Sequence, residues 1–339
     1  MPEIEIWRSA SPDPWHNLAV EELLLDTVGE NRFRLYLWQN RDTIVIGKNQ
    51  NPWKECRAAL LEKEGGYLAR RLSGGGTVFH DLGNLNFTFL MHRDHYDLAK
   101  QAGVILGAVR KLGIPAEMSG RNDLTIDGRK FSGNAFCFRK NSAYHHGTIL
   151  VRSDFERLAK YLQVSEEKIR SKGIASVRSR VVNLTEYCPE LTVETVAAAL
   201  CREFAAVYGA PDGAPDVGSI PEIKSTGQLD QAVIRQLYAK YASWEWRYGE
   251  APQFDLETAT RFPWGGIEIG LKLEKGIITA AAVYSDAMDE AFIGMLAPVL
   301  QGNILDAKGL AEKIRGLEAG AERAQWQEDI AAWLAAKEF

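Results

Sequence analysis

The first 150 residues contain short runs rich in β-branched and aromatic residues, each soon interrupted by glycine or polar turn residues. The runs RLYLWQ (34–39) and TIVIG (43–47) are separated only by Asn40-Arg41-Asp42, which predicts a β-hairpin. A further run, YLARR, leads into Ser73-Gly74-Gly75-Gly76, where any regular element must end. Asp127-Gly128 lies between two more β-type runs and is a strong signal for a tight hairpin. The pattern therefore predicts strands joined by tight turns, and a fold organised around a sheet.

Helical periodicity appears between these runs and becomes more frequent further along the chain. Apolar residues at helical spacing predict a helix over 97–112, which ends where Gly113 and Pro115 follow. Ser153-Asp154-Phe155-Glu156 has the form of a capping box, so a helix is expected to begin there. Further helices are expected at 54–64, 193–208 and 229–243, and further strands at TVFHD (77–81), LNFTFLMH (85–92) and 144–151.

The pattern of residues changes after the polar segment 245–253, which contains glycine and proline. Residues 265–285 alternate through a predicted hairpin turned at Lys275-Gly276, and segments rich in Ala, Leu and Glu continue to the C-terminus. With 339 residues, the chain is long enough for about two domains. We therefore predict a larger mixed α/β domain followed by a small α+β domain of about 85 residues.

The overall composition argues against two classes of partner. The chain is 46% hydrophobic and 25% charged with a formal net charge of -5, so it carries no global basic field for nucleic acid. No run approaches the roughly 18 consecutive apolar residues of a membrane span. The N-terminal stretch MPEIEIWRSASPDPW is acidic and interrupted by proline, unlike a signal peptide. We expect a cytoplasmic protein that binds neither nucleic acid nor a membrane.

The cysteines and histidines give no sign of a metal centre. The four cysteines form no CxxC pair and have no zinc-finger spacing, so we interpret them as thiols in a reducing compartment. The six histidines include His145-His146, but the sequence contains no HExxH motif. No prosthetic group is therefore expected.

The segment from Arg70 to Thr77 has the composition of an anion-binding loop. Two arginines directly precede three glycines, whose backbone N–H groups can approach an anion without interference from side chains. Arginine adds permanently charged, bidentate contacts to phosphate. The segment is neither a Walker A loop nor a GxGxxG motif. A flexible glycine turn without any ligand is an equal alternative on these residues alone.

A second candidate segment lies at residues 120–133. Lys130 follows the predicted tight turn on a strand that continues into another glycine, where its amine could hold a carboxylate, a phosphate or a leaving group. Asp123 is a candidate ligand for Mg²⁺, which prefers one or two carboxylates together with substrate phosphates. A surface lysine and a turn aspartate are the ordinary alternative.

Two weaker features complete the set of candidates. His80 precedes Asp81, but the sequence lacks the GxSxG elbow of a nucleophile triad, so His80 is interpreted as a polar group lining a pocket. The segment 172–180 carries three basic residues and could close over an anionic intermediate, or form a solvated charged loop.

These segments, in this order, resemble the lipoate-protein ligase A family. Any single segment has little specificity, whereas the ordered set is highly specific and extends over essentially the whole chain. The matching pieces are DPWHNLAVEE (13–22), LYLWQNRDTIVIGKNQNPWKEC (35–56), ARRLSGGGTVFHDLGNLNFTF (69–89), SGRNDLTIDGRKFSGNAF (119–136), YHHGTILV (144–151), KGIASVRSRVVNLTE (172–186), WEWRYGEAPQF (244–254) and FPWGGIEI (262–269).

The resemblance implies a fold and a reaction. The fold is α/β (α+β): a catalytic domain over 1–246, of the class II aminoacyl-tRNA synthetase and biotin-ligase type, a linker at about 247–253, and an accessory domain over 254–339. The reaction uses ATP and Mg²⁺ in two steps. Lipoate is first activated to lipoyl-AMP with release of pyrophosphate. The lipoyl group is then transferred to a lysine of an acceptor protein.

The resemblance also implies roles for individual residues. Lys130 contacts both the lipoyl carboxyl and the phosphate, and stabilises negative charge without forming a covalent bond. The residues that would bind ATP or the adenylate are, besides Lys130, Arg71, Gly76, Thr77, Val78, Phe79, Asn122 and Asp123, together with Lys172 and Ser176 of a covering loop at 172–177. The residues that would bind the lipoyl group, besides Lys130, are Arg70, Ser73, Gly75, His80 and Trp38. Asp123 is also the tentative Mg²⁺ ligand, and Trp38 is almost equally well explained as a core residue.

Three other interpretations remain. The first is an octanoyl or lipoyl transferase that uses Cys137 as an acyl-carrying thiolate, which requires an activated thiol. The second is a biotin-protein ligase, although no GRGRxGR-like loop is present. The third is a non-catalytic protein that binds lipoyl carriers. By resemblance, the acceptors are lipoyl domains of 2-oxoacid dehydrogenase E2 subunits and the glycine cleavage H protein.

Overall fold

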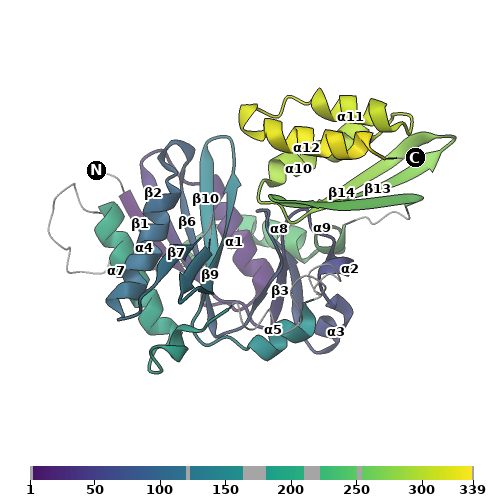
Figure 1. The fold of residues 1–339 in the computed structure, drawn as a ribbon. Helices are drawn as coiled ribbons and strands as arrows, with labels where there is room; N and C mark the ends of the chain where they lie inside the picture. The colour runs from purple at the N-terminus through teal and green to yellow at the C-terminus, as the bar shows by residue number, and fades with distance from the viewer. Residues whose placement is uncertain (1–2, 120–122, 163–180, 210–221, 250–253, 338–339) are drawn as a thin grey trace. The chain divides into compact units, whose positions relative to one another are not determined.

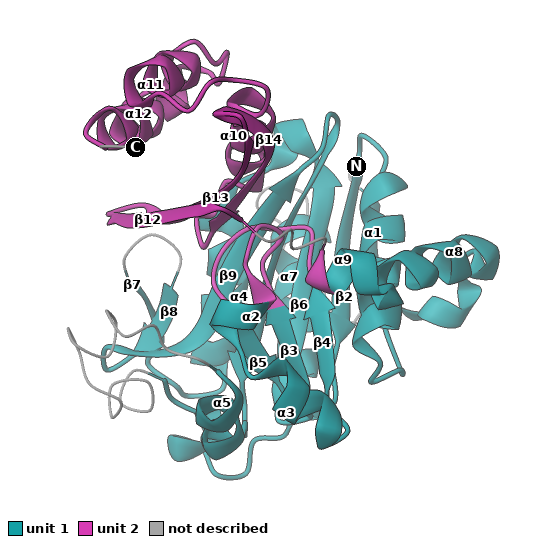
Figure 2. Cartoon of the chain, turned by 90° about the vertical axis from the view of Figure 1, so that its right-hand side faces the viewer, with its two compact units in different colours: residues 1–45, 53–70, 78–247 teal, residues 46–52, 71–77, 248–339 magenta. Residues whose placement is uncertain are grey.

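The computed structural model describes residues 3–119, 123–162, 181–209, 222–249 and 254–337 (Figure 1). The chain forms two compact units (Figure 2). The larger unit comprises residues 1–45, 53–70 and 78–247, and the smaller unit comprises 46–52, 71–77 and 248–339. Residues 71–77, called the glycine segment below, therefore belong to the same unit as the C-terminal region.

An eight-stranded sheet forms the centre of the larger unit, in the order β11-β1-β2-β6-β10-β9-β8-β7. β1 is parallel to β2 and β11, whereas the pairs from β2 to β7 are antiparallel. The strands are β1 (Glu3–Arg8), β2 (Arg32–Trp38), β6 (Asn84–His92), β7 (Glu117–Ser119), β8 (Asp123–Ile126), β9 (Arg129–Phe138), β10 (Ser142–Leu150) and β11 (Ile223–Ser225).

Two helices, α4 (Leu98–Lys111) and α7 (Val193–Gly209), cover one face of this sheet (Figure 1). Their apolar sides pack on alternate residues of the strands, so that Leu85, Phe87 and Phe89 of β6 are buried in one core. The alternation of β6 follows from the period of two along a strand. The predicted helices 97–112 and 193–208 are confirmed by α4 and α7.

The opposite face of the sheet is partly covered by α1 (Pro14–Asp26), which contacts β2, β6 and β10. α1 begins where the Asp13 side chain accepts hydrogen bonds from the backbone N–H groups of Trp15 and His16. Two further helices, α8 (Gln231–Ala242) and α9 (Trp244–Tyr248), follow β11 in the chain, and α8 packs on α1. α8 confirms the helix predicted at 229–243.

The hairpin predicted for residues 34–47 is wrong, although both of its strands exist. β3 (Thr43–Ile46) belongs to a separate three-stranded sheet with β4 (Tyr67–Arg70) and β5 (Val78–His80), in the order β4-β3-β5. Both edges of β2 are already occupied, by β1 and β6, so β3 has no free edge there. The chain turns away at Gln39, whose carbonyl accepts a hydrogen bond from Asn17 Nδ2 at 2.8 Å.

The hairpin predicted at Asp127-Gly128 is confirmed as the turn between β8 and β9. Asp127 has a φ of 50° and Gly128 a φ of 73°, so both central residues are left-handed, as a type I′ turn requires. The register of this hairpin shifts between Leu124 and Thr125 because β9 contains one extra residue there. The shift decides which side chains of β9 share a face.

Two of the local helix predictions need correction. The single helix expected at 54–64 is broken into α2 (Pro52–Glu55) and α3 (Ala58–Lys63), because Cys56 between them forms a β-bridge with Leu162. The helix expected after residue 153 is α5 (Phe155–Tyr161), but its cap is Asp154. The Asp154 carboxylate accepts from the backbone N–H groups of Glu156 and Arg157 at 2.9 and 3.1 Å.

The C-terminal part of the smaller unit is a three-stranded antiparallel sheet with helices on one face. Its strands are β12 (Leu256–Phe262), β13 (Gly265–Glu274) and β14 (Ile277–Ser285), and its helices are α10 (Glu290–Leu300), α11 (Ala307–Arg315) and α12 (Ala324–Ala335). The hairpin predicted at Lys275-Gly276 is confirmed, with φ values of 50° and 80°. Within the described part of the chain, no helix combines the length and the apolar character that crossing a bilayer requires.

Candidate functional site

The face of the large sheet opposite α4 and α7 carries polar residues of β6. Asn86 and Thr88 alternate with the buried phenylalanines and therefore lie on the face that α1 partly covers. Thr88 is fixed by α1, because its hydroxyl donates to the Glu21 carboxylate at 2.7 Å. Asn86 lies two residues before Thr88 on β6, next to Trp38 in the register of β2 and β6.

The neighbouring strands contribute one residue each at the level of Asn86. Trp38 of β2 and Thr148 of β10 are both registered with Asn86. Gly133 of β9 donates its backbone N–H to the Thr148 hydroxyl at 3.2 Å. We call Trp38, Asn86, Thr148 and Gly133 the transverse row. Because neighbouring strands lie about 4.8 Å apart, the row extends roughly 14 Å across the sheet.

Trp38 ends the row on one side with a large, fixed ring. Its side chain is 3% exposed, and its indole Nε1 donates to the Thr88 hydroxyl at 3.1 Å. Since Thr88 in turn donates to Glu21, the plane of the indole is fixed through helix α1.

Lys130 lies at the other end of the row. The register shift in β9 puts the Lys130 side chain over Gly133, where an added Cβ would meet Lys130 Cε at 2.8 Å and Nζ at 3.0 Å. The Lys130 amine forms an ion pair with Asp123 at 2.7 Å, and both side chains are partly exposed. The Lys130 carbonyl accepts from the Val182 N–H at 2.9 Å, which fixes the backbone. Gly133 thus leaves room for the Lys130 ammonium group, which is held at one position.

A buried acid of α1 and a histidine of β10 lie beside the row. Glu21 is 1% exposed, and its Oε1 lies 2.8 Å from His146 Nδ1. The same oxygen accepts from Thr88, so Glu21 links β6 and β10 to α1. A carboxylate buried at this depth is stabilised only by such paired contacts.

His80 lies close to Trp38 within the larger unit. It belongs to β5 and is 3% exposed, and its Nδ1 is 3.1 Å from Asn40 Nδ2. Its ring centroid lies 6.0 Å from that of Trp38 in an edge-on arrangement. The structure therefore brings together two of the residues that the resemblance assigns to the lipoyl group.

Arg70 ends β4 and is almost fully buried. Its guanidinium donates to the carbonyl oxygens of Trp246 and Arg247 at 2.8 and 2.9 Å. These carbonyls belong to the last residues of the larger unit, so Arg70 holds α9 to the three-stranded sheet of that unit.

Arg71, which follows Arg70 in the chain, belongs to the smaller unit and organises the glycine segment. Its guanidinium donates to Ser73 Oγ at 2.9 Å and to the carbonyl oxygens of Gly74 and Gly76, both at 2.7 Å. Gly75 has a φ of 86°, which only glycine adopts easily, and its N–H donates to the Ala287 carbonyl at 2.9 Å. The segment is therefore an ordered loop folded around the arginine.

The remaining predicted site residues occupy three settings. Thr77 donates from its hydroxyl to Gln50 Oε1 at 3.0 Å, within the smaller unit. Val78 and Phe79 are strand residues of β5 in the larger unit, where the Phe79 ring lies 5.7 Å from that of Tyr161. Asn122, Lys172 and Ser176 lie outside the described residues.

Several residues of this site were missed by reasoning from the sequence, namely Asn86, Thr148, Gly133, Glu21 and His146 as a partner of Glu21. The alternation in LNFTFLMH was the available signal, because it sets Asn86 and Thr88 on one face and three large apolar side chains on the other. Glu21 gave no such signal, because glutamate side chains are almost never fully buried unless they are paired.

Three of the four cysteines, Cys56, Cys137 and Cys201, are buried in the larger unit, and Cys188 is partly buried. Desolvation raises the pKa of Cys56 to about 12 and that of Cys201 to about 11, so both are neutral thiols at physiological pH. Cys137 lies in β9 opposite Tyr144, four residues beyond Gly133. Among the described residues, no three or more His, Cys, Asp or Glu side chains come together as a metal cluster.

His145 faces the core on the other side of the sheet from His146. Its ring nitrogens lie 3.0 Å from Gln101 Oε1 and 2.8 Å from Asn134 Oδ1, and desolvation lowers its pKa to about 3. A neutral imidazole has only one N–H, so one of the two amides turns its NH₂ group toward the ring. His145 is therefore a neutral structural histidine.

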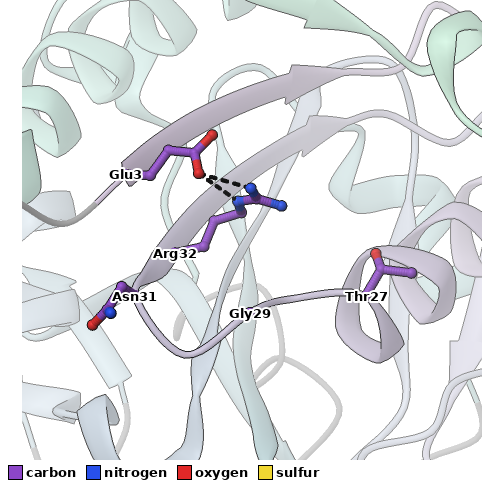
Figure 3. A pocket seen from close by; sticks show the side chains of 5 residues that line it. All are labelled: Glu3, Thr27, Gly29, Asn31 and Arg32. Carbon is purple, nitrogen blue, oxygen red and sulfur yellow. Dashed lines mark hydrogen bonds and ion pairs between the residues drawn. The ribbon is translucent and has the colours of Figure 1, made fainter.

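A shallow hollow of about 290 Å³ lies elsewhere on the larger unit, where β1 and β2 begin (Figure 3). It is lined by Glu3, Thr27, Gly29, Asn31 and Arg32. Glu3 and Arg32 form an ion pair at 2.7 Å, so the charges of the hollow already satisfy each other. None of its lining residues belongs to the transverse row.

Solved structures of similar proteins share this fold. The P. falciparum LipL1 protein, solved in complex with lipoate, is 27% identical with a TM-score of 0.84, and the match covers 99% of this chain and 100% of that chain. The bi-partite lipoate protein ligase of Thermoplasma acidophilum, solved with its E2 lipoyl domain, is 26% identical with a TM-score of 0.65, over 76% of this chain and 100% of that chain. A lipoate-protein ligase A bound with ATP, at 24% identity and a TM-score of 0.63, has the same fold over 74% of this chain and 100% of that chain.

Two sequence profiles together match most of the chain. The lipoyl protein ligase A/B catalytic domain matches residues 13–205, and the bacterial lipoate protein ligase C-terminus matches residues 251–334. The first profile alone covers more than half of the sequence, and the mixed α/β fold with its small C-terminal sheet is that of solved lipoate ligases. The chain therefore belongs to the lipoate-protein ligase family.

Proposed function

We propose that this chain is an ATP-dependent lipoate-protein ligase that works in two steps. In the first step, a lipoate carboxylate oxygen attacks the α-phosphorus of ATP, and the bond to the β-phosphate oxygen breaks to release pyrophosphate. In the second step, the ε-amine of an acceptor lysine attacks the acyl carbon of lipoyl-AMP. The acyl C–O bond breaks, AMP leaves, and the amine loses a proton as the amide forms.

The observation that carries the proposal is the arrangement of Lys130 and Trp38 at opposite ends of the transverse row. An extended eight-carbon acyl chain spans about two strand spacings, or roughly 10 Å, which fits within the row. In the proposal, the lipoate carboxylate binds the Lys130 amine and the dithiolane ring lies toward Trp38 and His80. The residues between them are too small to obstruct a chain that crosses the strands.

The charge of Lys130 suits the first step. This step brings two anions together, so the site has to neutralise charge and align the reacting atoms. Asp123 holds the Lys130 amine at 2.7 Å, and we propose that an incoming carboxylate or phosphate exchanges with it. Released from Lys130, the Asp123 carboxylate is our candidate for the Mg²⁺ that accompanies ATP, since Mg²⁺ accepts one carboxylate together with phosphate oxygens.

For the nucleotide, we propose the residues that the family resemblance assigned to it. Arginine and exposed backbone N–H groups of glycine are chemically suited to phosphate. The proposed contacts are those of Arg71, Gly76, Thr77, Val78, Phe79, Asn122 and Asp123, with a covering loop that includes Lys172 and Ser176. Arg70, Ser73 and Gly75 are proposed for the lipoyl end, with Trp38 and His80.

For the acceptor, we propose lipoyl domains. The T. acidophilum ligase was solved with its E2 lipoyl domain, which supports an acceptor of this class. Lipoyl domains of 2-oxoacid dehydrogenase E2 subunits and the glycine cleavage H protein are the proposed partners.

The proposal is tested by lipoate-dependent ATP–pyrophosphate exchange with Mg²⁺ and without an acceptor. The parent is expected to catalyse exchange, and Lys130→Met is expected to lose it by roughly 10²–10³-fold, as when one charge-stabilising group is removed from an active site. Lys140→Met is a matched control, because Lys140 lies exposed in the turn between β9 and β10.

The outcomes separate the steps of the proposal. Exchange by the parent and by Lys140→Met, but not by a folded Lys130→Met, supports both the reaction and the role of Lys130. Exchange that persists in Lys130→Met contradicts the role of this lysine. A parent that catalyses no exchange but moves octanoyl groups between carriers without ATP would be a transferase instead.

A further inference from the structure

Asn86 is a buried amide in the middle of the transverse row. Its side chain is 1% exposed, and within the described part of the chain its Nδ2 atom has no hydrogen-bond partner. Buried amide donors are nearly always paired, because an unpaired one loses its water without compensation. An orphaned donor at this position therefore indicates a partner that is absent from the polypeptide.

The Asn86 amide forms one hydrogen bond to its neighbour on the same strand, and Asn84 Oδ1 has no partner within the described part of the chain. Asn84, which is fully buried, donates from Nδ2 to Asn86 Oδ1 at 2.8 Å. The Asn86 oxygen is therefore engaged, and its nitrogen is the end turned away from Asn84. The Thr148 hydroxyl, next in the row, already accepts the Gly133 N–H.

The distance of Asn86 from Lys130 determines which part of a bound acyl chain it meets. Asn86 is two strands away from Gly133, over which the Lys130 side chain lies, or roughly 10 Å across the sheet. With a carboxylate at the Lys130 amine, this distance reaches the far end of an eight-carbon chain. That end carries the two ring sulfurs in lipoate and an unsubstituted hydrocarbon in octanoate.

We propose that Asn86 is a specificity-determining residue that favours lipoate over octanoate, by donating from Nδ2 to a dithiolane sulfur. This inference rests on the proposed function, since it assumes that the carboxylate lies at Lys130. A sulfur of the cyclic disulfide is a weak acceptor, but octanoate offers no acceptor at all at this position. A bound octanoyl chain therefore leaves the Asn86 donor buried and unpaired, and a site with such a donor discriminates against the ligand that lacks the acceptor.

The test compares three acids of matched length: lipoate, octanoate and 5-cyclopentylpentanoate, which keeps the five-membered ring but lacks sulfur. Adenylation is followed by pyrophosphate release, and kcat/KM is measured for each acid. The parent is expected to prefer lipoate over both other acids about tenfold, in the lower part of the range for an unpaired buried donor. The cyclopentyl acid separates recognition of sulfur from recognition of ring shape and requires no variant.

The variant Asn86→Leu, which has nearly the same size, is expected to adenylate lipoate and 5-cyclopentylpentanoate with similar kcat/KM values. Phe87→Leu is the matched control, because Phe87 lies on the opposite face of β6 in the core, and it should keep the preference of the parent. A second variant, Asn84→Leu, removes the donor that orients Asn86 and should reduce the preference without abolishing it.

The inference and the proposed function fail in different ways. A parent that adenylates all three acids with equal kcat/KM, or an Asn86→Leu variant that retains the preference for lipoate, overturns the role of Asn86 alone. A parent that adenylates none of them overturns the proposed function and this inference together.

Discussion

His145 should make the stability of the larger unit depend on pH. In the folded protein its pKa is lowered from 6.5 to about 3, because burial disfavours the charged imidazole and His146 lies nearby. The unfolded chain takes up a proton at this histidine as the pH falls below about 6.5, whereas the folded chain does not do so until about pH 3. Protonation therefore stabilises the unfolded state, and stability is lost as the pH falls through this window.

The magnitude follows from the two pKa values. Between pH 7 and pH 4.5, the contribution of His145 to the free energy of unfolding falls by about 2.5 kcal/mol, close to 1.4 kcal/mol for each pH unit below 6.5. Replacing His145 with glutamine keeps a polar side chain near Gln101 and Asn134 but removes the titration. We expect the variant to be less stable than the parent at pH 7, by about 1–3 kcal/mol, because its hydrogen bonds are imperfect.

The assay is urea-induced unfolding followed by circular dichroism at pH 7 and pH 4.5. The loss of stability between the two pH values should be about 2.5 kcal/mol smaller in His145→Gln than in the parent. His95→Gln makes the same chemical change at an exposed position and controls for the loss of one histidine. If the parent and His145→Gln lose the same stability on acidification, the buried, neutral state assigned to His145 is refuted.

Two further substitutions test the candidate site. Gly133→Ala should displace the Lys130 amine, because the new Cβ would lie 2.8 Å from Lys130 Cε, and should lower lipoate-dependent ATP–pyrophosphate exchange by about 10–100-fold. Gly103→Ala, on α4 with open space around it, is the matched control, and parent-like exchange by a folded Gly133→Ala would refute the argument. Cys137→Ser should transfer the lipoyl group from lipoyl-AMP at nearly the parent rate, because Cys137 lies four residues beyond Gly133 along β9. A loss of more than about tenfold would restore the cysteine-transferase alternative.

The elements that the sequence predicted well are those decided by neighbours along the chain. The turn at Asp127-Gly128 requires two left-handed residues in succession, and few residues other than Asp, Asn and Gly supply them. The pairing of β3 was predicted wrongly because it depends on strands that are distant in the sequence. β2 pairs with β1 and β6, and nothing within residues 34–47 reports that both edges of β2 are taken.

In the candidate site, too, some features follow from the local sequence and others depend on the pairing of strands that are distant in the sequence. Lys130 and Trp38 were singled out by residue type and by family resemblance, and their roles remain predictions. That the two residues share one face depends on the register of four strands and on the extra residue in β9. Asn86 enters the site only through that register, and Glu21 only through its contacts with Thr88 and His146.

The glycine segment shows why a correct chemical argument can still be incomplete. Its glycines were predicted to bring backbone N–H groups close to an anion, yet Gly74 approaches protein backbone within the smaller unit, whereas the space beside Gly76 is open. A Cβ at Gly74 would lie 2.4 Å from the Ala287 carbonyl oxygen and 2.6 Å from that of Met288, so packing is a sufficient reason for glycine here. The Gly75 N–H already donates to Ala287. Under the proposed function, a ligand that accepts from the Gly75 N–H has to replace this hydrogen bond to Ala287.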